Sequence, residues 1–248
     1  MQRYFLDFEP TSTTFQLPTD LAHHFITVLR AQVDDQAEFV LPDRETVILA
    51  RVKQLQVDGA QMEVLERYQP QVELPVEVTL IIALAKGTKP ELVVQKATEL
   101  GVKELIFVET AWSVVHWGSK AAKKVARLQK VAQAAAEQSH RTKVPIVNYQ
   151  SALTSLRLAE TAKKVVAWEE SAKQGEQRQL ARVFQQLKPG DHLVALIGPE
   201  GGLTPTEITE LKQVGFIPVG LGPRIMRAET APLYILAALS YALELAAE

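Results

Sequence analysis

The pattern from Val76 onward most limits the folds open to this chain, because short apolar runs alternate there with amphipathic segments. Such alternation is typical of strands joined through helices, which lie parallel in one sheet with right-handed crossovers. Apolar runs predict strands at residues 76–85, 106–108, 146–149, 165–168, 191–197 and 216–221. Helices are predicted from Thr88 to Gly101, at residues 119–139 and 176–187, and after Thr204 and Thr230. We therefore predict a doubly wound α/β domain with a parallel sheet.

Residues 3–68 follow a different pattern, in which short stretches rich in β-branched and aromatic residues predict strands. These strands are expected at residues 4–8, 36–41, 46–55 and 61–68, with one helix at residues 20–30. The helix is expected to bury Leu21, Phe25, Val28 and Leu29 on one face and to end at Arg30. Several short strands with one helix suggest a small barrel. Residues 68–75 carry two prolines and no periodic pattern, so we predict domains at residues 1–70 and 71–248.

Two loops follow the apolar runs at residues 191–197 and 216–221, and each contains a Gly-Pro pair. Strands of a parallel sheet end at one edge, where open α/β sheets bind small ligands. In the first loop Gly198, Gly201 and Gly202 lack a Cβ and permit close approach of a ligand. Thr204 and Glu207 then have the spacing of a capping box, so a plain strand-to-helix turn explains this loop at least as well. The loop has neither the Gly-Lys-Ser/Thr ending of a phosphate loop nor the dinucleotide pattern G-x-G-x-x-G.

The second loop carries Arg224 and Arg227 on either side of Ile225 and Met226. Two arginines beside apolar side chains suit a site that holds both a flat apolar group and an anionic one. A surface loop with two solvated arginines is the alternative, and it explains neither the glycines nor the apolar pair. We therefore predict a ligand site formed by both loops.

Composition excludes several kinds of site. The chain has no cysteine, so disulfides, thiolate metal sites and cysteine nucleophiles are excluded, and His23 and His24 lack the further ligands that a metal site needs. The net charge of −2 gives no general basic field, so RNA binding requires a local patch. Charged residues near Met1 are unlike a signal peptide, and the longest apolar run, residues 231–243, is too short to span a bilayer. We expect a cytoplasmic protein.

A local basic patch is predicted on the helix at residues 119–139. Its basic side chains recur every three or four residues: Lys120, Lys123, Lys124, Arg127 and Lys130. They lie opposite Val125, Leu128 and Val131, and Glu137 is the one acid between residues 113 and 145. Like charges at this spacing repel and a polyanion relieves that repulsion, although a solvated helix face is the alternative. Trp112 and Trp117 flank the patch and are either base-stacking or buried side chains.

Five separated blocks resemble one known family. They are H-H-F-I-T-V-L-R from His23, A-K-G-T-K-P-E-L-V-V-Q-K-A-T-E-L-G-V from Ala85, A-A-E-Q-S-H-R-T-K-V-P from Ala135, I-G-P-E-G-G-L-T-P-T-E-I from Ile197 and L-G-P-R-I-M-R-A-E-T-A from Leu221. These blocks resemble the RsmE family of SPOUT-class methyltransferases, which methylate N3 of a uridine in 16S ribosomal RNA. The resemblance implies a PUA-like β-barrel that binds RNA, a SPOUT α/β domain with a trefoil knot, S-adenosylmethionine as cofactor, and a homodimer in which residues 231–245 are a candidate interface.

The resemblance also implies which residues bind the cofactor. They are Ile197, Gly198, Pro199, Glu200, Gly201, Gly202, Leu221, Gly222, Arg224, Ile225, Met226 and Arg227, with Trp168 and Glu169 as a third wall. Candidate RNA contacts are His23, Arg30, Lys86, Lys89, Lys120, Lys123, Arg127, Gln138, Ser139 and Arg141. The family usually has an arginine before Ser113, where this chain has Trp112.

Uridine N3 carries a proton and is a poor nucleophile until that proton leaves. Our hypothesis is that Arg224 or Arg227 stabilises the uracil anion and that Glu200 or Glu229 accepts the proton. The alternative for Glu229 is charge compensation at a helix N-terminus. Three other functions stay open: a SPOUT methyltransferase with another RNA target, a non-catalytic RNA-binding protein, and a generic nucleotide-binding enzyme.

Overall fold

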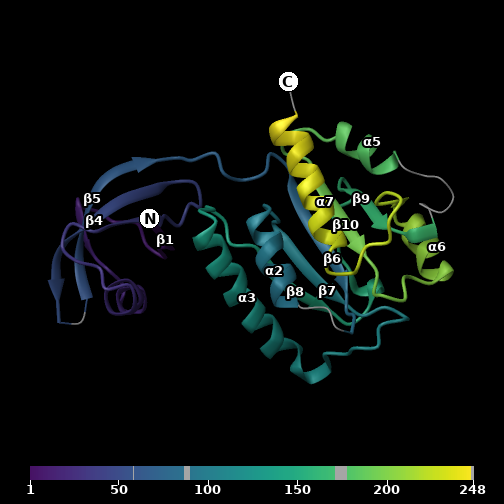
Figure 1. Cartoon of the computed structure of the whole chain (residues 1–248), viewed down its shortest axis with the longest axis horizontal. Helices are drawn as coiled ribbons and strands as arrows, with labels where there is room; N and C mark the ends of the chain where they lie inside the picture. The colour runs from purple at the N-terminus through teal and green to yellow at the C-terminus, as the bar shows by residue number, and fades with distance from the viewer. Residues whose placement is uncertain (58, 87–89, 171–177, 247–248) are drawn as a thin grey trace. The chain divides into compact units, whose positions relative to one another are not determined.

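The computed structural model describes residues 1–57, 59–86, 90–170 and 178–246. The chain divides into two compact units, which Figure 1 traces by colour. The first unit comprises Met1–Glu73 together with Ala136–Lys143, and the second comprises Leu74–Ala135 together with Val144–Glu248. Among the described residues, no helix is both long and apolar enough to cross a membrane.

The second unit is built on a parallel sheet, as predicted. Its strands are β6 (Glu77–Ala83), β7 (Glu104–Val108), β8 (Ile146–Gln150), β9 (Lys163–Ala167), β10 (His192–Ile197) and β11 (Phe216–Val219). They lie in the order β11-β9-β10-β6-β7-β8, and every neighbouring pair is parallel. β6, β7, β8 and β10 lie close to their predicted positions. The expected trefoil knot stays a prediction.

Helices cover both faces of this sheet. They are α2 (Pro90–Glu99), α3 (Ala121–Gln138), α5 (Gln179–Gln185), α6 (Pro205–Gln213) and α7 (Ala231–Ser240), with short turns η2 (Gly118–Lys120) and η3 (Leu153–Ser155) and the π-helical η4 (Tyr241–Leu245). The predicted caps at Thr88 and the predicted helix start at residue 176 lie outside the described residues. Gly101 follows α2 with φ +90°, and its neighbour Val102 donates back to the carbonyl oxygen of Ala97, so glycine ends this helix as predicted.

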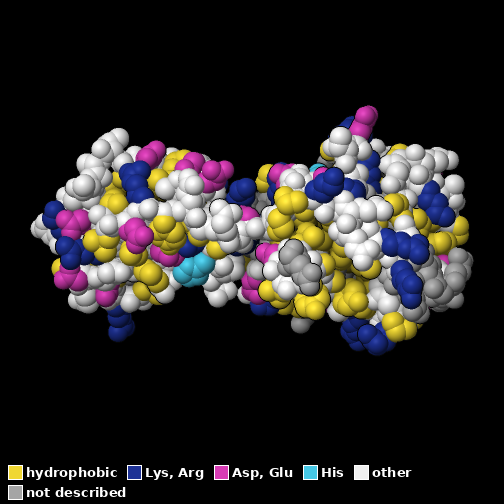
Figure 2. All heavy atoms as spheres, turned by 90° about the horizontal axis from the view of Figure 1, so that it is seen from above, with side chains coloured by type: hydrophobic (Ala, Val, Ile, Leu, Met, Phe, Trp, Pro, Cys, Tyr) yellow, Lys and Arg dark blue, Asp and Glu magenta, His cyan; other side chains and the backbone are white. Residues whose placement is uncertain are grey.

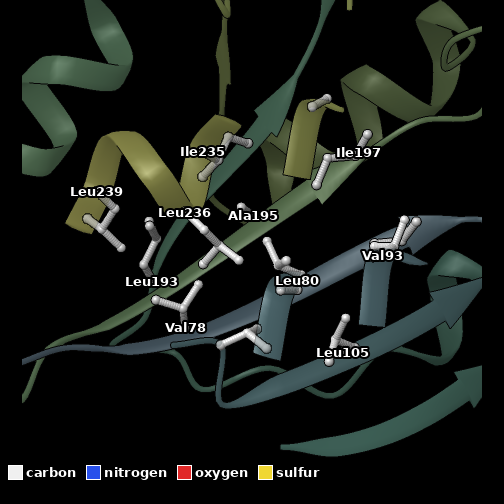
Figure 3. Close-up of a cluster of buried hydrophobic side chains, with 14 of the residues drawn as sticks. Val78, Leu80, Val93, Leu105, Leu193, Ala195, Ile197, Ile235, Leu236 and Leu239 are labelled. Atoms are coloured by element: carbon white, nitrogen blue, oxygen red, sulfur yellow. The ribbon is translucent and has the colours of Figure 1, made fainter. Parts of the chain in front are cut away.

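Alternate residues of each strand face opposite layers. Leu193, Ala195 and Ile197 belong to the larger core, which also contains Ile235 of α7 and Val93 of α2 (Figure 3). The residues between them, Val194 and Leu196, face α6 in a separate cluster. Because both faces of the sheet are buried, each strand is a continuous apolar run in the sequence. The strand positions could therefore be predicted well.

The first unit has a five-stranded sheet and its own core. Its strands are β1 (Gln2–Phe5), β2 (Thr14–Gln16), β3 (Gln36–Val40), β4 (Val47–Gln56) and β5 (Gly59–Tyr68), in the order β1-β3-β4-β5-β2. Tyr4, Phe39 and Met62 are fully buried in that core. Three predicted strands are confirmed, whereas β1 begins and ends earlier than expected. β2 was missed because a three-residue strand is too short to show alternation.

The helix predicted at residues 20–30 is wound differently. A four-residue α-helix, α1 (Thr19–Ala22), continues as a π-helix, η1 (His23–Val28), and the Leu29 amide donates to the His24 carbonyl five residues back. A π-helix closes its hydrogen bonds between residues five apart, so each turn holds more residues and a stripe counted at the α-helical period leaves the buried face. The predicted burial of Val28 and Leu29 is therefore wrong: they are 56% and 47% exposed. Arg30 lies just past the helix with φ +59°, not in its last turn.

The segment Ala136–Lys143 is held in the first unit by two carboxylates, the buried Glu38 and the partly buried Glu73. Glu38 accepts hydrogen bonds from Arg3, Tyr68 and His140, and Arg3 also donates to the His140 carbonyl oxygen. Burial raises the pKa of Glu38, but these hydrogen bonds and the charge of Arg3 together outweigh it, so the pKa lies below its usual range. Glu73 accepts from the Arg141 guanidinium and from the backbone amides of Thr142 and Lys143.

Replacing Glu73 with alanine is expected to lower the free energy of unfolding by about 3–5 kcal/mol, because a buried guanidinium loses its carboxylate partner. Glu73→Gln is the matched control, since an amide oxygen still accepts a hydrogen bond, and it should lose less. Urea unfolding followed by circular dichroism measures both variants. Wild-type stability in Glu73→Ala would show that the contact is dispensable.

Candidate active site at the sheet edge

The strands β9, β10 and β11 end side by side. Ala167 at the end of β9 is paired with Ile197 of β10 on one side and with Val219 of β11 on the other. The loops that follow these three strands therefore leave from neighbouring points on one edge of the sheet. The prediction that both Gly-Pro loops share an edge is confirmed.

The first loop, residues 198–203, folds tightly on itself. A Cβ on Gly198 would come within 3.1 Å of the Leu203 side chain and 3.3 Å of the Gly202 carbonyl carbon. Gly202 has φ +77°, and its amide donates to the Pro199 carbonyl oxygen at 2.8 Å. Pro199 is buried, while Glu200 and Gly201 are exposed. The loop thus presents backbone and one carboxylate at the edge.

The predicted capping box at the end of this loop is confirmed. The Thr204 hydroxyl accepts from the Glu207 amide at 3.1 Å, and Glu207 Oε2 accepts from the Thr204 amide at 2.8 Å. The second oxygen of Glu207 has another partner, the Ala111 amide, at 2.8 Å. This contact joins the loop after β7 to the start of α6, and no local sequence pattern predicted it.

The second loop, residues 220–230, bends at Gly222, which has φ +96°. Arg224 and Arg227 are exposed, and Ile225 is 79% exposed between them. Met226 instead packs against the large core, so the two members of the apolar pair lie in different surroundings. The loop therefore offers two cations and one free apolar side chain at the edge.

A cavity of about 460 Å³, lined mostly by apolar residues, opens beside the second loop. It is lined by residues of α5, α7 and η4, by Leu187 and by Gly220, Leu221 and Gly222. Leu221 and Gly222 were predicted as cofactor residues, whereas the lining from Leu180, Phe184 and Tyr234 was not. In the sequence these helix residues resemble ordinary core residues, and they lie near the loop only in the folded protein.

Trp168, predicted with Glu169 to form a third wall of the cofactor site, turns its ring away from the face of Leu221. The ring packs in the cluster on the α6 face of the sheet, and Lys212 Nζ of α6 lies 5.7 Å from the ring centroid. Leu221 belongs to the opposite face. Residues alternate across a strand, so Trp168 follows Val166 toward α6 and only its backbone reaches the edge beside Val219. Glu169 is exposed.

A third loop, residues 109–118, follows β7. Glu109 accepts from the Tyr149 hydroxyl, from His116 Nδ1 at 2.6 Å and from the Trp117 amide at 3.2 Å. Burial raises the pKa of Glu109, but these hydrogen bonds outweigh it and the pKa falls below its usual range. Trp117 is only 4% exposed and stacks on Tyr149, so it is a core residue. Trp112 in the same loop is 49% exposed.

The basic helix α3 has the predicted polarity. Leu128 is buried, and the lysines at 120, 123, 124 and 130 are exposed. Two of its cations have partners that the sequence of the helix does not reveal. Arg127 Nη2 lies 3.1 Å from Glu91 Oε1 of α2, and Lys124 Nζ lies 5.4 Å from the Trp117 ring centroid. Figure 2 shows Lys and Arg side chains dispersed among other described residues on the face it presents, as the net charge of −2 implies.

The remaining candidate RNA contacts differ in accessibility. His23, Arg30, Lys86 and Gln138 are exposed, and Ser139 is half-buried. Lys89 lies outside the described residues. Arg141 is a correction: it is 3% exposed and its guanidinium binds Glu73, so its side chain is a structural element of the first unit.

Known proteins resemble this chain over nearly its full length. The family model described as an RNA methyltransferase domain matches residues 72–240. Ribosomal RNA small subunit methyltransferase E of Bacillus subtilis is 39% identical over 99% of this chain and 98% of its own length. The Neisseria gonorrhoeae enzyme of that name, crystallised with S-adenosyl methionine, has a TM-score of 0.80 at 28% identity, covering 97% of each chain. A Legionella pneumophila structure with the same cofactor bound has a TM-score of 0.78 at 25% identity, also covering 97% of each chain. This chain therefore belongs to the ribosomal RNA small subunit methyltransferase E family.

Proposed function

We propose that this protein transfers a methyl group from S-adenosylmethionine to N3 of a uridine in the 16S RNA of the small ribosomal subunit. The observation that carries the proposal is the junction of the two Gly-Pro loops at one sheet edge, in a chain 39% identical to a named methyltransferase over 99% of its length. We further propose that it acts in the cytoplasm, where small subunits are assembled.

The described residues fit the cofactor on two counts. Gly198 and Gly202 leave a turn that a Cβ would fill or strain, so backbone amides and carbonyls there can approach a ligand closely. The cavity beside Leu221 and Gly222 lies within the range of about 300–1,000 Å³ that small-molecule sites occupy. Residues 197–202 and 221–227 are the segments we assign to cofactor binding, with the backbone of Trp168 and Glu169 beside them. Bound S-adenosylmethionine supplies an electrophilic methyl group on its sulfonium sulfur.

The chain itself must lower the cost of removing the uridine N3 proton. Arg224 and Arg227 are exposed cations at the edge, and we assign one of them to stabilising the charge that develops on the uracil oxygens. Glu200 is exposed on the first loop, and Glu229 is half-buried just before α7. We assign proton acceptance to one of these carboxylates. For Glu229 the competing role is charge compensation at the N-terminus of α7.

RNA binding is assigned to exposed basic residues in both units. Lys120 of η2 and the lysines of α3 provide a one-sided positive face, and His23 and Arg30 are accessible in the first unit. We also propose a homodimer through α7 and η4, because Tyr234, Tyr241 and Leu245 remain exposed there at 40%, 63% and 76%.

The test is methyl transfer from labelled S-adenosylmethionine to small ribosomal subunits. Subunits from cells that lack this enzyme should accept label, whereas subunits from normal cells are already methylated and should accept little. Equal labelling of both, or labelling of transfer RNA alone, would assign the protein to another RNA target. Binding of cofactor and RNA without transfer would identify a non-catalytic RNA-binding protein.

A further inference from the structure

Trp112 is a large aromatic side chain left half-exposed beside the cofactor loop. Its Cβ and Cε3 atoms lie 3.7 and 3.8 Å from the point that a Cβ on Gly201 would occupy. A side chain added at Gly201 would therefore touch Trp112, which places the indole next to the loop that we assign to cofactor binding. A side chain of this size is normally buried, whereas Trp112 is 49% exposed to solvent in the described part of the chain.

The loop that carries Trp112 is built as a rigid turn. The Ser113 amide donates to the Thr110 carbonyl oxygen at 3.0 Å, and the Thr110 amide donates back to Ser113 Oγ at 3.1 Å. Ser113 is buried. Next to it, the Ala111 amide donates to Glu207 Oε1 at 2.8 Å. Hydrogen bonds on both sides of Trp112 therefore hold the backbone that carries the indole.

Glu207 links this turn to the cofactor loop. One carboxylate oxygen binds the Ala111 amide, and the other binds the Thr204 amide and hydroxyl at the end of residues 198–203. A single side chain thus bridges the turn that carries the indole and the end of the glycine loop. This arrangement resembles a supported binding site more than a loose surface loop.

We propose that Trp112 is a stacking platform for an unpaired nucleobase of the RNA substrate and that Glu207 is the positioning residue that holds it beside the cofactor loop. The inference rests on the proposed function. Bases that leave a helix are commonly held by stacking on aromatic side chains. The chain continues from Trp112 into α3, whose exposed lysines supply the positive charge that an RNA backbone needs.

Trp112→Ala should weaken binding of a 16S RNA fragment that contains the target uridine by about 5- to 150-fold, the usual loss of one stacked base. Trp112→Phe should bind nearly as well as wild type, because a phenyl ring still stacks. Affinity for S-adenosylmethionine should not change. Val114→Ala is the matched control, since Val114 is apolar, 69% exposed and two residues away, and it should leave RNA affinity unchanged. Equal RNA affinity of Trp112→Ala and wild type would overturn the proposal.

The same titration with an abasic nucleotide at the target position identifies the stacked base. If the target uracil is the partner, wild type and Trp112→Ala bind the abasic RNA equally well. If a neighbouring base is the partner, the loss caused by Trp112→Ala persists. These binding measurements do not require turnover. A failure of the proposed methylation in the wild type is therefore distinguishable from a failure of the stacking role.

A double-mutant cycle tests the role of Glu207. Glu207→Gln keeps the side-chain length but lacks one of the two acceptor oxygens, so it should weaken RNA binding in the wild-type background. In the Trp112→Ala background it should weaken RNA binding little further, because both changes remove the same interaction. Fully additive losses would show that Glu207 does not act through Trp112. A thermal unfolding measurement on each variant separates these effects from loss of the fold.

Discussion

Arg227→Gln or Arg224→Gln is expected to lower kcat by about 10²–10³-fold at saturating cofactor, the loss typical of removing one group that stabilises transition-state charge. Both guanidinium groups are exposed and neither makes an ion pair within the described residues. Their removal should therefore change the free energy of unfolding by no more than about 0.5 kcal/mol. Initial rates of labelled methyl transfer and a thermal unfolding curve, measured on the same preparations, check both parts.

Two further variants sharpen this prediction. Lysine at the same position should recover part of the rate, because it restores the charge but not the planar fork. Arg157→Gln is the matched control: Arg157 is exposed, and its hydrogen bonds go to backbone carbonyls of its own turn. It should keep wild-type turnover. If Arg224→Gln, Arg227→Gln, Glu200→Gln and Glu229→Gln all turn over at the wild-type rate, the assigned chemistry is wrong.

Gly202→Ala should lower activity by about 10²-fold or more through loss of cofactor binding, because a small displacement of a binding loop is enough for that effect. Gly202 has φ +77°, where an L-residue costs roughly 1–2 kcal/mol. The substitution forces either that strain or a rearrangement of residues 198–203. Calorimetric titration with S-adenosylmethionine measures the expected loss of affinity.

Gly190 provides the control for Gly202, because it lies at the opposite end of β10, away from the sheet edge that carries the two loops. Gly190 precedes β10 with φ +87°, and like Gly202 it has no atom within 4 Å of an added Cβ. Gly190→Ala should therefore cost similar stability and leave cofactor affinity intact. Equal cofactor affinity in Gly202→Ala and Gly190→Ala would remove the first loop from the cofactor site.

The strands and several helix ends of the second unit could be predicted from the sequence, for a physical reason. Strands buried on both faces leave long apolar runs, and the glycine after α2 and the capping box at Thr204 mark helix ends by local hydrogen bonding. The carboxyl ends of parallel strands lie at one edge of the sheet, so the sequence alone predicts that the two Gly-Pro loops lie together. The sequence also placed the basic face of α3 correctly.

The sequence could not predict features that depend on contacts between distant segments. Arg141 lies in one of the blocks that resemble the family and was predicted to contact RNA, but its guanidinium binds Glu73, which is far away in the chain. Arg127 likewise has an acid on another helix. The sequence of residues 23–28 shows no periodicity that distinguishes a π-helix from an α-helix. The direction of the Trp168 ring depends on where β9 ends, which the sequence does not locate to the residue. The link between Glu207 and Ala111 joins two loops that only the sheet brings together.

The most direct test of the central claim is nucleoside mass spectrometry of 16S RNA after reaction with the purified protein and S-adenosylmethionine. Small subunits from cells that lack the enzyme should gain 3-methyluridine, and the same subunits incubated with Gly202→Ala should gain little. A methyl group on a ribose, on another base or on no nucleoside at all, from protein that binds both cofactor and RNA, would contradict the assigned reaction.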